Sequence, residues 1–136
     1  MKDKLKKFAP AAAWLAFILV LTSIPSPGFS VVQVRGADKL LHFLLYLPFG
    51  LLLFRALGAV SLKPALACLL LCAAVALCDE LHQTLIPGRF FEFFDLAADV
   101  AGSGLGMVIY TVIKRRAALR GRRDRNERAV ERNTED

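Results

Sequence analysis

The sequence predicts an all-α membrane protein built as a bundle of four transmembrane helices. Hydrophobic residues make up 56% of its 136 residues, more than a soluble domain of this size usually carries. The excess lies in four stretches, at residues 8–24, 40–57, 65–85 and 96–113. A helix needs about 20 apolar residues to cross roughly 30 Å of hydrocarbon, and each stretch approaches this length.

The first stretch, residues 8–24, follows a lysine-rich beginning. This pattern resembles a secretory signal, but the residues after it lack an A-x-A cleavage site. We therefore expect a retained first span, with a cleaved signal as the alternative. The Pro-Ser-Pro-Gly sequence at residues 25–28 is typical of a turn and begins an outer loop that runs to about Ala37.

The second and third stretches are the clearest predicted spans. Pro48 lies inside the second, and the turn at residues 61–64 returns the chain to the third. The third stretch contains all three cysteines, Cys68, Cys72 and Cys78. We expect them to pack as small apolar side chains. A metal pair at Cys68 and Cys72, which share a helix face, is the alternative.

The fourth stretch is diluted by Asp99 and by glycines, of which Gly102 and Gly106 form a G-x-x-x-G pattern. This pattern allows close approach of a neighbouring helix, which we expect to be the end of the third span. Residues 1–113 are thus predicted to form one four-span domain. Residues 114–136 alternate in charge, and we expect a disordered cytoplasmic tail.

The distribution of charge predicts the orientation. With four spans, most of the 18 lysines and arginines lie on the side of the two termini, whereas only Arg35, Lys39 and Arg89 lie on the other. Loops rich in Lys and Arg stay in the cytoplasm, so both termini are predicted to be cytoplasmic. The net charge of +6 is explained by contact with anionic lipid, and we predict no nucleic-acid partner.

Ionisable residues gather at the ends of the apolar stretches that are predicted to face outward. Because residues four apart share a helix face, Asp38, His42 and Tyr46 form one stripe, and Asp79 and Gln83 form another. Ionisable groups near hydrocarbon are costly and usually functional. The full set of candidate site residues in this region comprises Asp38, His42, Tyr46, Asp79, Glu80, Gln83, Arg89, Asp95 and Asp99.

We assign these candidates two kinds of role. Asp79, Glu80, His42 and Asp99 are the candidate catalytic groups, because carboxylates and imidazole carry general acid–base chemistry. The candidate substrate-binding residues are Asp38, Tyr46, Gln83, Arg89 and Asp95, with Arg89 as the counter-ion or anion clamp. Helix capping is the alternative for Asp38 and Asp95, and a network that only holds the helices together is the alternative for the whole set.

No cofactor is predicted. A divalent metal ion is the alternative, and its ligands would come from His42, Asp79, Glu80 and His82, with Asp38 and Asp99 as further oxygen donors. The sequence contains no H-E-x-x-H pattern, and D-E-L-H at residues 79–82 supplies only part of one.

The polar motifs resemble those of the VanZ-like family. They are D-K-L-L-H-F-x-x-Y at residues 38–46, D-E-x-x-Q at 79–83, P-G-R at 87–89 and D-x-x-x-D-x-x-G at 95–102. The resemblance covers about residues 8–113 and departs at Asp99, where the family often has Asn. It implies a multi-pass protein of the bacterial cytoplasmic membrane, and the family's namesake is associated with lowered sensitivity to the glycopeptide teicoplanin.

Two functions remain open from the sequence. The first is an activity at the outer face on a cell-envelope lipid or lipid-linked precursor. The second is a non-catalytic protein that binds or shields such a molecule, or that uses its polar cluster only as structure. A proton-coupled transporter fits less well, because the acids gather at one end and do not cross the bilayer.

Overall fold

The protein consists of four helices, as seen in a computed structural model that describes residues 2–25, 36–58 and 60–135. The helices are α1 (Lys2–Thr22), α2 (Ala37–Leu57), α3 (Leu62–Gln83) and α4 (Phe93–Glu135). The all-α prediction is confirmed, and the described residues contain no strand. The turn predicted at residues 25–28 and the loop after it fall mostly on residues 26–35, outside the described part.

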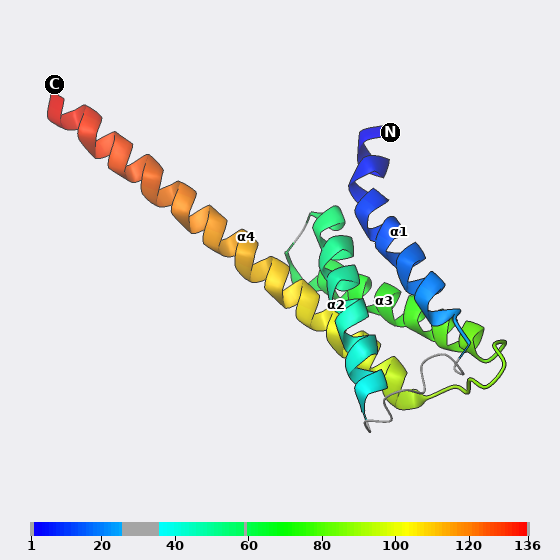
Figure 1. Cartoon of the computed structure of the whole chain (residues 1–136). Coiled ribbons are helices and arrows are strands. Elements are labelled where there is room, and N and C mark those ends of the chain that lie inside the picture. Colours follow the sequence, from blue (N-terminus) through cyan, green and yellow to red (C-terminus); the bar gives the residue numbers. More distant parts are fainter. Residues whose placement is uncertain (1, 26–35, 59, 136) are drawn as a thin grey trace.

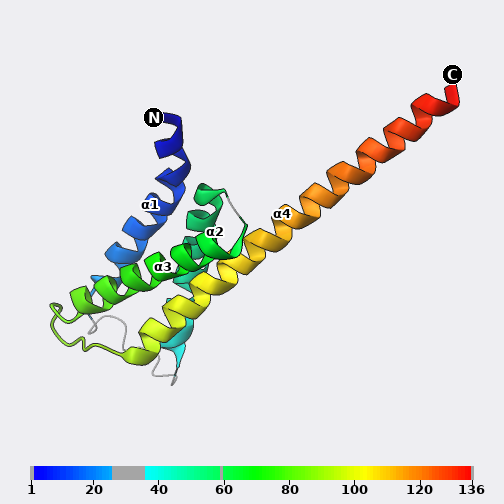
Figure 2. The same cartoon turned by 180° about the vertical axis from the view of Figure 1, so that it is seen from behind.

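Successive helices run in opposite directions, so the two chain ends lie on the same side of the bundle (Figure 1). At the other side, α1 and α3 end where α2 and α4 begin, and the view from behind shows the same arrangement (Figure 2). We call this second side the polar end. It collects the outward-predicted ends of all four apolar stretches, which places their polar residues near one another.

The central pair of the bundle is α2 and α4, which contact each other more extensively than any other two helices. A Cβ at Gly102 would overlap the Phe43 carbonyl, and one at Gly106 would overlap the Leu47 carbonyl. The G-x-x-x-G pattern thus permits near-backbone contact, as predicted. The neighbour, however, is α2 and not the end of α3, which corrects that part of the prediction.

The other two helices complete the core. α1 is joined to α2 by the Trp14 Nε1–H group, which donates to the Leu45 carbonyl at 2.8 Å. α3 contributes Cys68 and Cys72, which are buried and free, as expected for small packing residues. Cys78 is exposed. A Cys68–Cys72 metal pair remains untested.

Three helices are long and apolar enough to cross a membrane, among the residues described: α2, α3 and the part of α4 at Phe93–Arg128. α1 is not among these three. The four-span count therefore remains a prediction. Many large apolar side chains on these helices are exposed, which suits a surface in contact with lipid.

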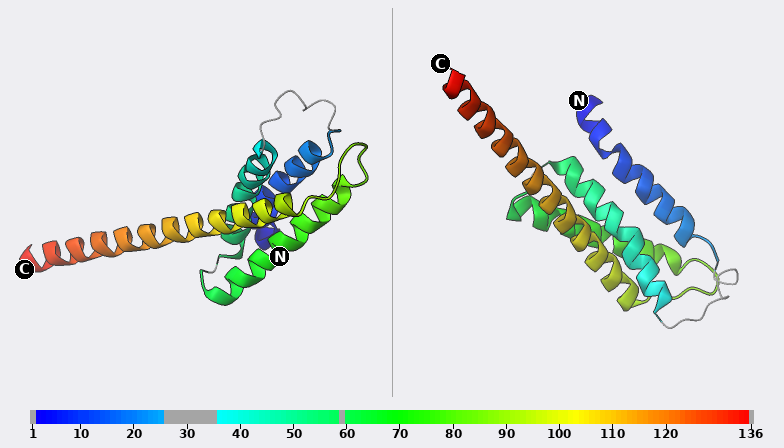
Figure 3. Two further views of the ribbon diagram at one scale, coloured as in Figure 1. Left: turned by 90° about the horizontal axis from the view of Figure 1, so that it is seen from below. Right: turned by 60° about the vertical axis from the view of Figure 1, so that its left-hand side comes forward.

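The charged tail continues α4 as helix to Glu135, where the sequence led us to expect disorder. Seen from below, α4 leaves the other helices and extends as a single rod (Figure 3). Arginine, alanine and glutamate are good helix formers, and the Arg123–Glu127 pair at 2.7 Å adds an i,i+4 contact. The span also supplies a formed helical end, which removes the cost of nucleation.

Candidate functional site

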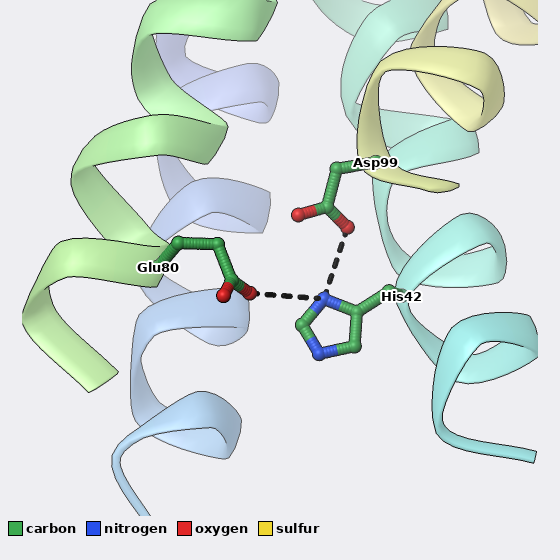
Figure 4. A group of neighbouring side chains, drawn as sticks. All are labelled: His42, Glu80 and Asp99. Carbon is green, nitrogen blue, oxygen red and sulfur yellow. Dashed lines mark hydrogen bonds and ion pairs between the residues drawn. The ribbon is translucent and has the colours of Figure 1, made fainter. Parts of the chain in front are cut away.

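A buried triad of ionisable residues forms the centre of the polar end. His42 of α2, Glu80 of α3 and Asp99 of α4 point toward one another (Figure 4). The His42 Nδ1 atom lies 3.1 Å from Asp99 Oδ1 and 4.0 Å from Glu80 Oε1. The exposed fraction is 0% for Asp99 and 1% for Glu80. Three helices therefore place two carboxylates and one imidazole in contact, away from solvent.

Asp79 has a different role from its neighbour Glu80, because it faces α1 and α2. Its Oδ1 accepts a hydrogen bond from Thr22 Oγ1 at 2.8 Å. Its Oδ2 accepts from Tyr46 Oη at 3.3 Å and from Gln83 Nε2 at 3.4 Å. Both oxygens of this buried carboxylate are thus satisfied by neutral donors. We call Asp79, Thr22, Tyr46 and Gln83 the Asp79 network.

The connector between α3 and α4 returns Arg89 to the site. Gly88 has a φ of 82°, which glycine adopts without strain, and the Arg89 N–H closes the turn onto the Ile86 carbonyl at 3.1 Å. This turn aims Arg89 back, and its Nη1 donates to Gln83 Oε1 at 2.5 Å. Among the described contacts, Arg89 is bonded to an amide and not directly to a carboxylate.

A second group of charges lies nearer to the surface, around Lys39. The ammonium donates to Asp38 Oδ2 at 2.8 Å, to Glu92 Oε2 at 2.8 Å and to Asp95 Oδ1 at 3.0 Å. We call these four residues the outer ion cluster. The capping alternative for Asp38 is wrong, because the N-cap of α2 is Gly36 and Asp38 lies in the first turn.

Two buried polar atoms in this region have no hydrogen-bond partner, namely Asp99 Oδ2 and Arg89 Nε. The first is an acceptor and the second is a donor. A buried polar atom without a partner costs about 1–3 kcal/mol, so such atoms mark places where a ligand or ion can add stability. Both occur at the polar end, one in the buried triad and one beside Gln83.

The structure groups the predicted residues differently from the sequence-based assignment. The groups of described side chains close enough to share a metal ion are His42 with Glu80 and Asp99, and Asp38 with Glu92 and Asp95. The predicted ligands also included Asp79 and His82, which lie outside both groups. His82 is exposed and lies 3.1 Å from Ser23 Oγ, since it leaves α3 on the face opposite to Glu80.

Some functional neighbours were not predicted. Thr22 had no sequence signal beyond its position at the end of the first apolar stretch, yet it bonds Asp79. Ser103 is fully buried and donates to the Tyr46 carbonyl at 3.4 Å. Its place four residues after Asp99, on the same helix face, is the pattern that would have found it.

A cavity of about 400 Å³ lies at the opposite end of the bundle, lined in part by Lys6, Lys7, Arg55 and Tyr110. It contains none of the residues of the buried triad. The buried charged side chains described gather instead at the polar end.

Apolar helices of spanning length, joined to a buried polar site at one end, define the class of this protein as a helical membrane protein. A family model described as VanZ/LLP1 matches residues 5–114. The chain belongs to the VanZ/LLP1 family, as the motifs of the sequence indicated. Comparison with curated proteins and with solved structures gave no match.

Proposed function

We propose that this chain is a four-span protein of the bacterial cytoplasmic membrane that acts on, or binds, a cell-envelope lipid or lipid-linked precursor. The observation that carries the proposal is the burial of His42, Glu80 and Asp99 together at one end of an otherwise apolar bundle. Ionisable groups at such a position are costly and usually have a function.

The orientation follows from the basic residues. Lysines begin α1, and Lys114, Arg115 and Arg116 follow the apolar part of α4, all away from the polar end. The preference of such residues for the cytoplasm supports a polar end at the outer face. The polar end would then meet the leaflet that contains lipid-linked precursors of the envelope.

The buried triad supports general acid–base chemistry. His42 lies between two carboxylates, so a proton removed from a headgroup hydroxyl or from water could pass between imidazole and carboxylate. Asp79 already accepts hydrogen bonds at both oxygens, which favours a positioning role over proton transfer. Arg89 and Gln83 form an arm that suits a phosphate or carboxylate of the headgroup.

The alternative is a protein without turnover, and two observations favour it. Nearly all buried polar side-chain atoms described here are satisfied within the chain, as expected of a network that holds helices together. In addition, Phe90, Phe93 and Phe94 are strongly exposed beside the polar end, with Phe90 82% exposed. Such rings suit contact with acyl chains at the bilayer interface, and so favour binding or shielding.

Two variants separate catalysis from binding without turnover. A bacterial host would produce the unaltered chain, Glu80→Gln and the double variant Phe90→Ala/Phe91→Ala, and the membrane abundance of each would be measured. The readouts are the lipids that co-purify in mild detergent, identified by mass spectrometry, and the susceptibility of the host to teicoplanin. A link to glycopeptide resistance is part of the proposal and is tested by the second readout.

If Glu80→Gln is present in the membrane at normal abundance but no longer changes the susceptibility of the host to teicoplanin, catalysis by the carboxylate is supported. A graded loss, larger in the phenylalanine variant, would support binding. If no envelope lipid is enriched and neither variant alters the host, the proposed function is wrong and the polar end is structural.

A further inference from the structure

We propose that His42, Glu80 and Asp99 bind a divalent transition-metal ion, of the class of Mn²⁺ or Zn²⁺. The donors are one imidazole nitrogen and two carboxylate oxygens, contributed by α2, α3 and α4 and directed at a common point (Figure 4). Imidazole suits zinc and iron, whereas carboxylate suits manganese, magnesium and calcium. The mixed set therefore favours a first-row transition metal over Mg²⁺ or Ca²⁺.

The distances suit such an ion. Ligand atoms at about 2.0–2.2 Å from a metal lie roughly 3–4.4 Å from one another. The three candidate atoms all lie within 4.8 Å of each other, with His42 Nδ1 at 3.1 Å from the Asp99 oxygen and 4.0 Å from the Glu80 oxygen. An ion can therefore be accommodated with small movements of the side chains.

The unpartnered oxygen of Asp99 is an independent indication. Asp99 is fully buried, and its Oδ2 has no hydrogen-bond partner, although the same carboxylate faces His42. A buried acceptor atom that lacks a hydrogen-bond partner is destabilising, and more so when it belongs to a charged group. A cation bound beside it would remove that cost.

The balance of charge leads to the same inference. Asp79, Glu80 and Asp99 are each at most 1% exposed, and His42 is the cationic side chain described in contact with Glu80 and Asp99. Three carboxylates against one imidazolium and the nearby Arg89 guanidinium, which is bonded to Gln83, leave an excess of negative charge in a poorly solvated region. An ion of charge +2, bound to a neutral imidazole, brings this region closer to neutrality.

A hydrogen bond from outside the triad orients the Glu80 carboxylate, one of the three metal-coordinating side chains. Glu80 Oε2 accepts a hydrogen bond from the Glu92 N–H at 3.1 Å. Its Oε1 faces His42 and accepts a long hydrogen bond from Gln83 Nε2 at 3.5 Å. Such contacts behind a ligand fix its orientation and tune its affinity. Three protein ligands also leave coordination positions free. That a headgroup oxygen fills one of them rests on the proposed function, whereas the metal site itself does not.

The second acidic group of the polar end provides a matched control. Asp38, Glu92 and Asp95 also lie close enough to share an ion, but the Lys39 ammonium already contacts all three. The outer ion cluster is thus neutralised by a side chain of the protein. We therefore expect a metal ion to bind at the buried triad and not at the outer ion cluster.

The experiment uses the full chain, purified in mild detergent with any affinity tag removed, washed with chelator and reloaded with Mn²⁺ or Zn²⁺ alone. We expect about one ion per chain by elemental analysis, because the triad forms one site. Asp99→Asn and Glu80→Gln should weaken Mn²⁺ affinity more than about tenfold, measured by electron paramagnetic resonance. Asp38→Asn should bind as the unaltered chain does.

A second variant keeps the test decisive even if Asp99→Asn fails to fold. The chain has two histidines, and His82 is exposed and outside the triad. In Mn²⁺-loaded His82→Gln, electron spin-echo modulation should show one bound imidazole nitrogen, which can only belong to His42. The proposal would be overturned by the absence of that nitrogen signal, or by clearly less than one bound ion per chain after reloading. It would also be overturned if Asp38→Asn weakened Mn²⁺ affinity as much as Asp99→Asn does. No substrate enters these measurements, so their outcome is separate from that of the lipid experiments.

Discussion

His42 on α2 and Asp99 on α4 are paired at 3.1 Å because their helices touch almost backbone to backbone just beyond them. Gly102 lies less than one turn after Asp99 and contacts the carbonyl of Phe43, the residue after His42. Without that contact the two side chains would be held apart by the bulk of their neighbours. The polar pair and the glycine stripe are therefore parts of the same interface.

The first prediction concerns this interface. Gly106→Ala should destabilise the protein by about 1–3 kcal/mol, because the added Cβ overlaps the backbone of α2 and the helices must separate. The measurement is thermal or denaturant unfolding in detergent. Gly121→Ala is the matched control, since nothing lies near a Cβ there. It should be neutral, or stabilising by up to about 1 kcal/mol. Equal effects of the two changes would contradict the assigned contact.

The second prediction concerns coupling within the buried triad. His42→Ala should cost about 3–5 kcal/mol, because it leaves a buried carboxylate without its partner. Asp99→Asn added to it should recover part of that loss, since the uncompensated charge is removed. A double-mutant cycle on unfolding free energies should give a coupling of about 0.5–3 kcal/mol. His82→Ala, on the exposed surface, should change stability by less than about 0.5 kcal/mol.

The third prediction concerns the attachment of α1. Thr22→Val removes the hydroxyl that donates to buried Asp79 at 2.8 Å. We expect a loss of about 1–3 kcal/mol, since the carboxylate oxygen is left with one partner fewer. Faster cleavage of α1 by protease should accompany the loss. Thr84→Val provides the control, because the Thr84 hydroxyl is exposed and bonds its own helix end. If both variants behave alike, Thr22 does not anchor α1.

The fourth prediction tests the orientation. In a Cys78→Ala background, Phe90→Cys should react with a membrane-impermeant maleimide added to intact cells. Arg120→Cys should react only after the cells are opened. Both positions are exposed, so a difference in labelling reports the side of the membrane. The reverse pattern would place the polar end in the cytoplasm.

Much of the fold could be predicted from the sequence. The apolar stretches gave the helices, and their alternation in direction placed the polar ends of α2, α3 and α4 together. The i,i+4 spacing of Asp38, His42 and Tyr46 did not put them in one cluster, because Asp38 is still at the surface whereas His42 is a turn deeper. Depth in the bundle depends on helix packing, which spacing does not encode.

The neighbours of Asp79 and of Glu80 could not be predicted from the sequence either. Adjacent residues on a helix point about 100° apart, so the two carboxylates face different neighbours, but the spacing does not say which. Both are buried because α3 contacts α1 on one side and the α2–α4 pair on the other. The rotation of each helix about its axis comes from contacts between distant segments, which no local pattern specifies.

The apolar half of the core has a consequence for how charge is distributed in the molecule. From Ser103 toward the end of the bundle opposite the polar end, the buried residues described are mainly hydrophobic. They include Leu53, Phe54, Cys68 and Met107. No chain of ionisable groups crosses this layer, in the described part of the core. Every buried charged side chain described lies at the polar end. This apolar layer therefore separates the buried triad from the basic residues at the opposite end of the bundle.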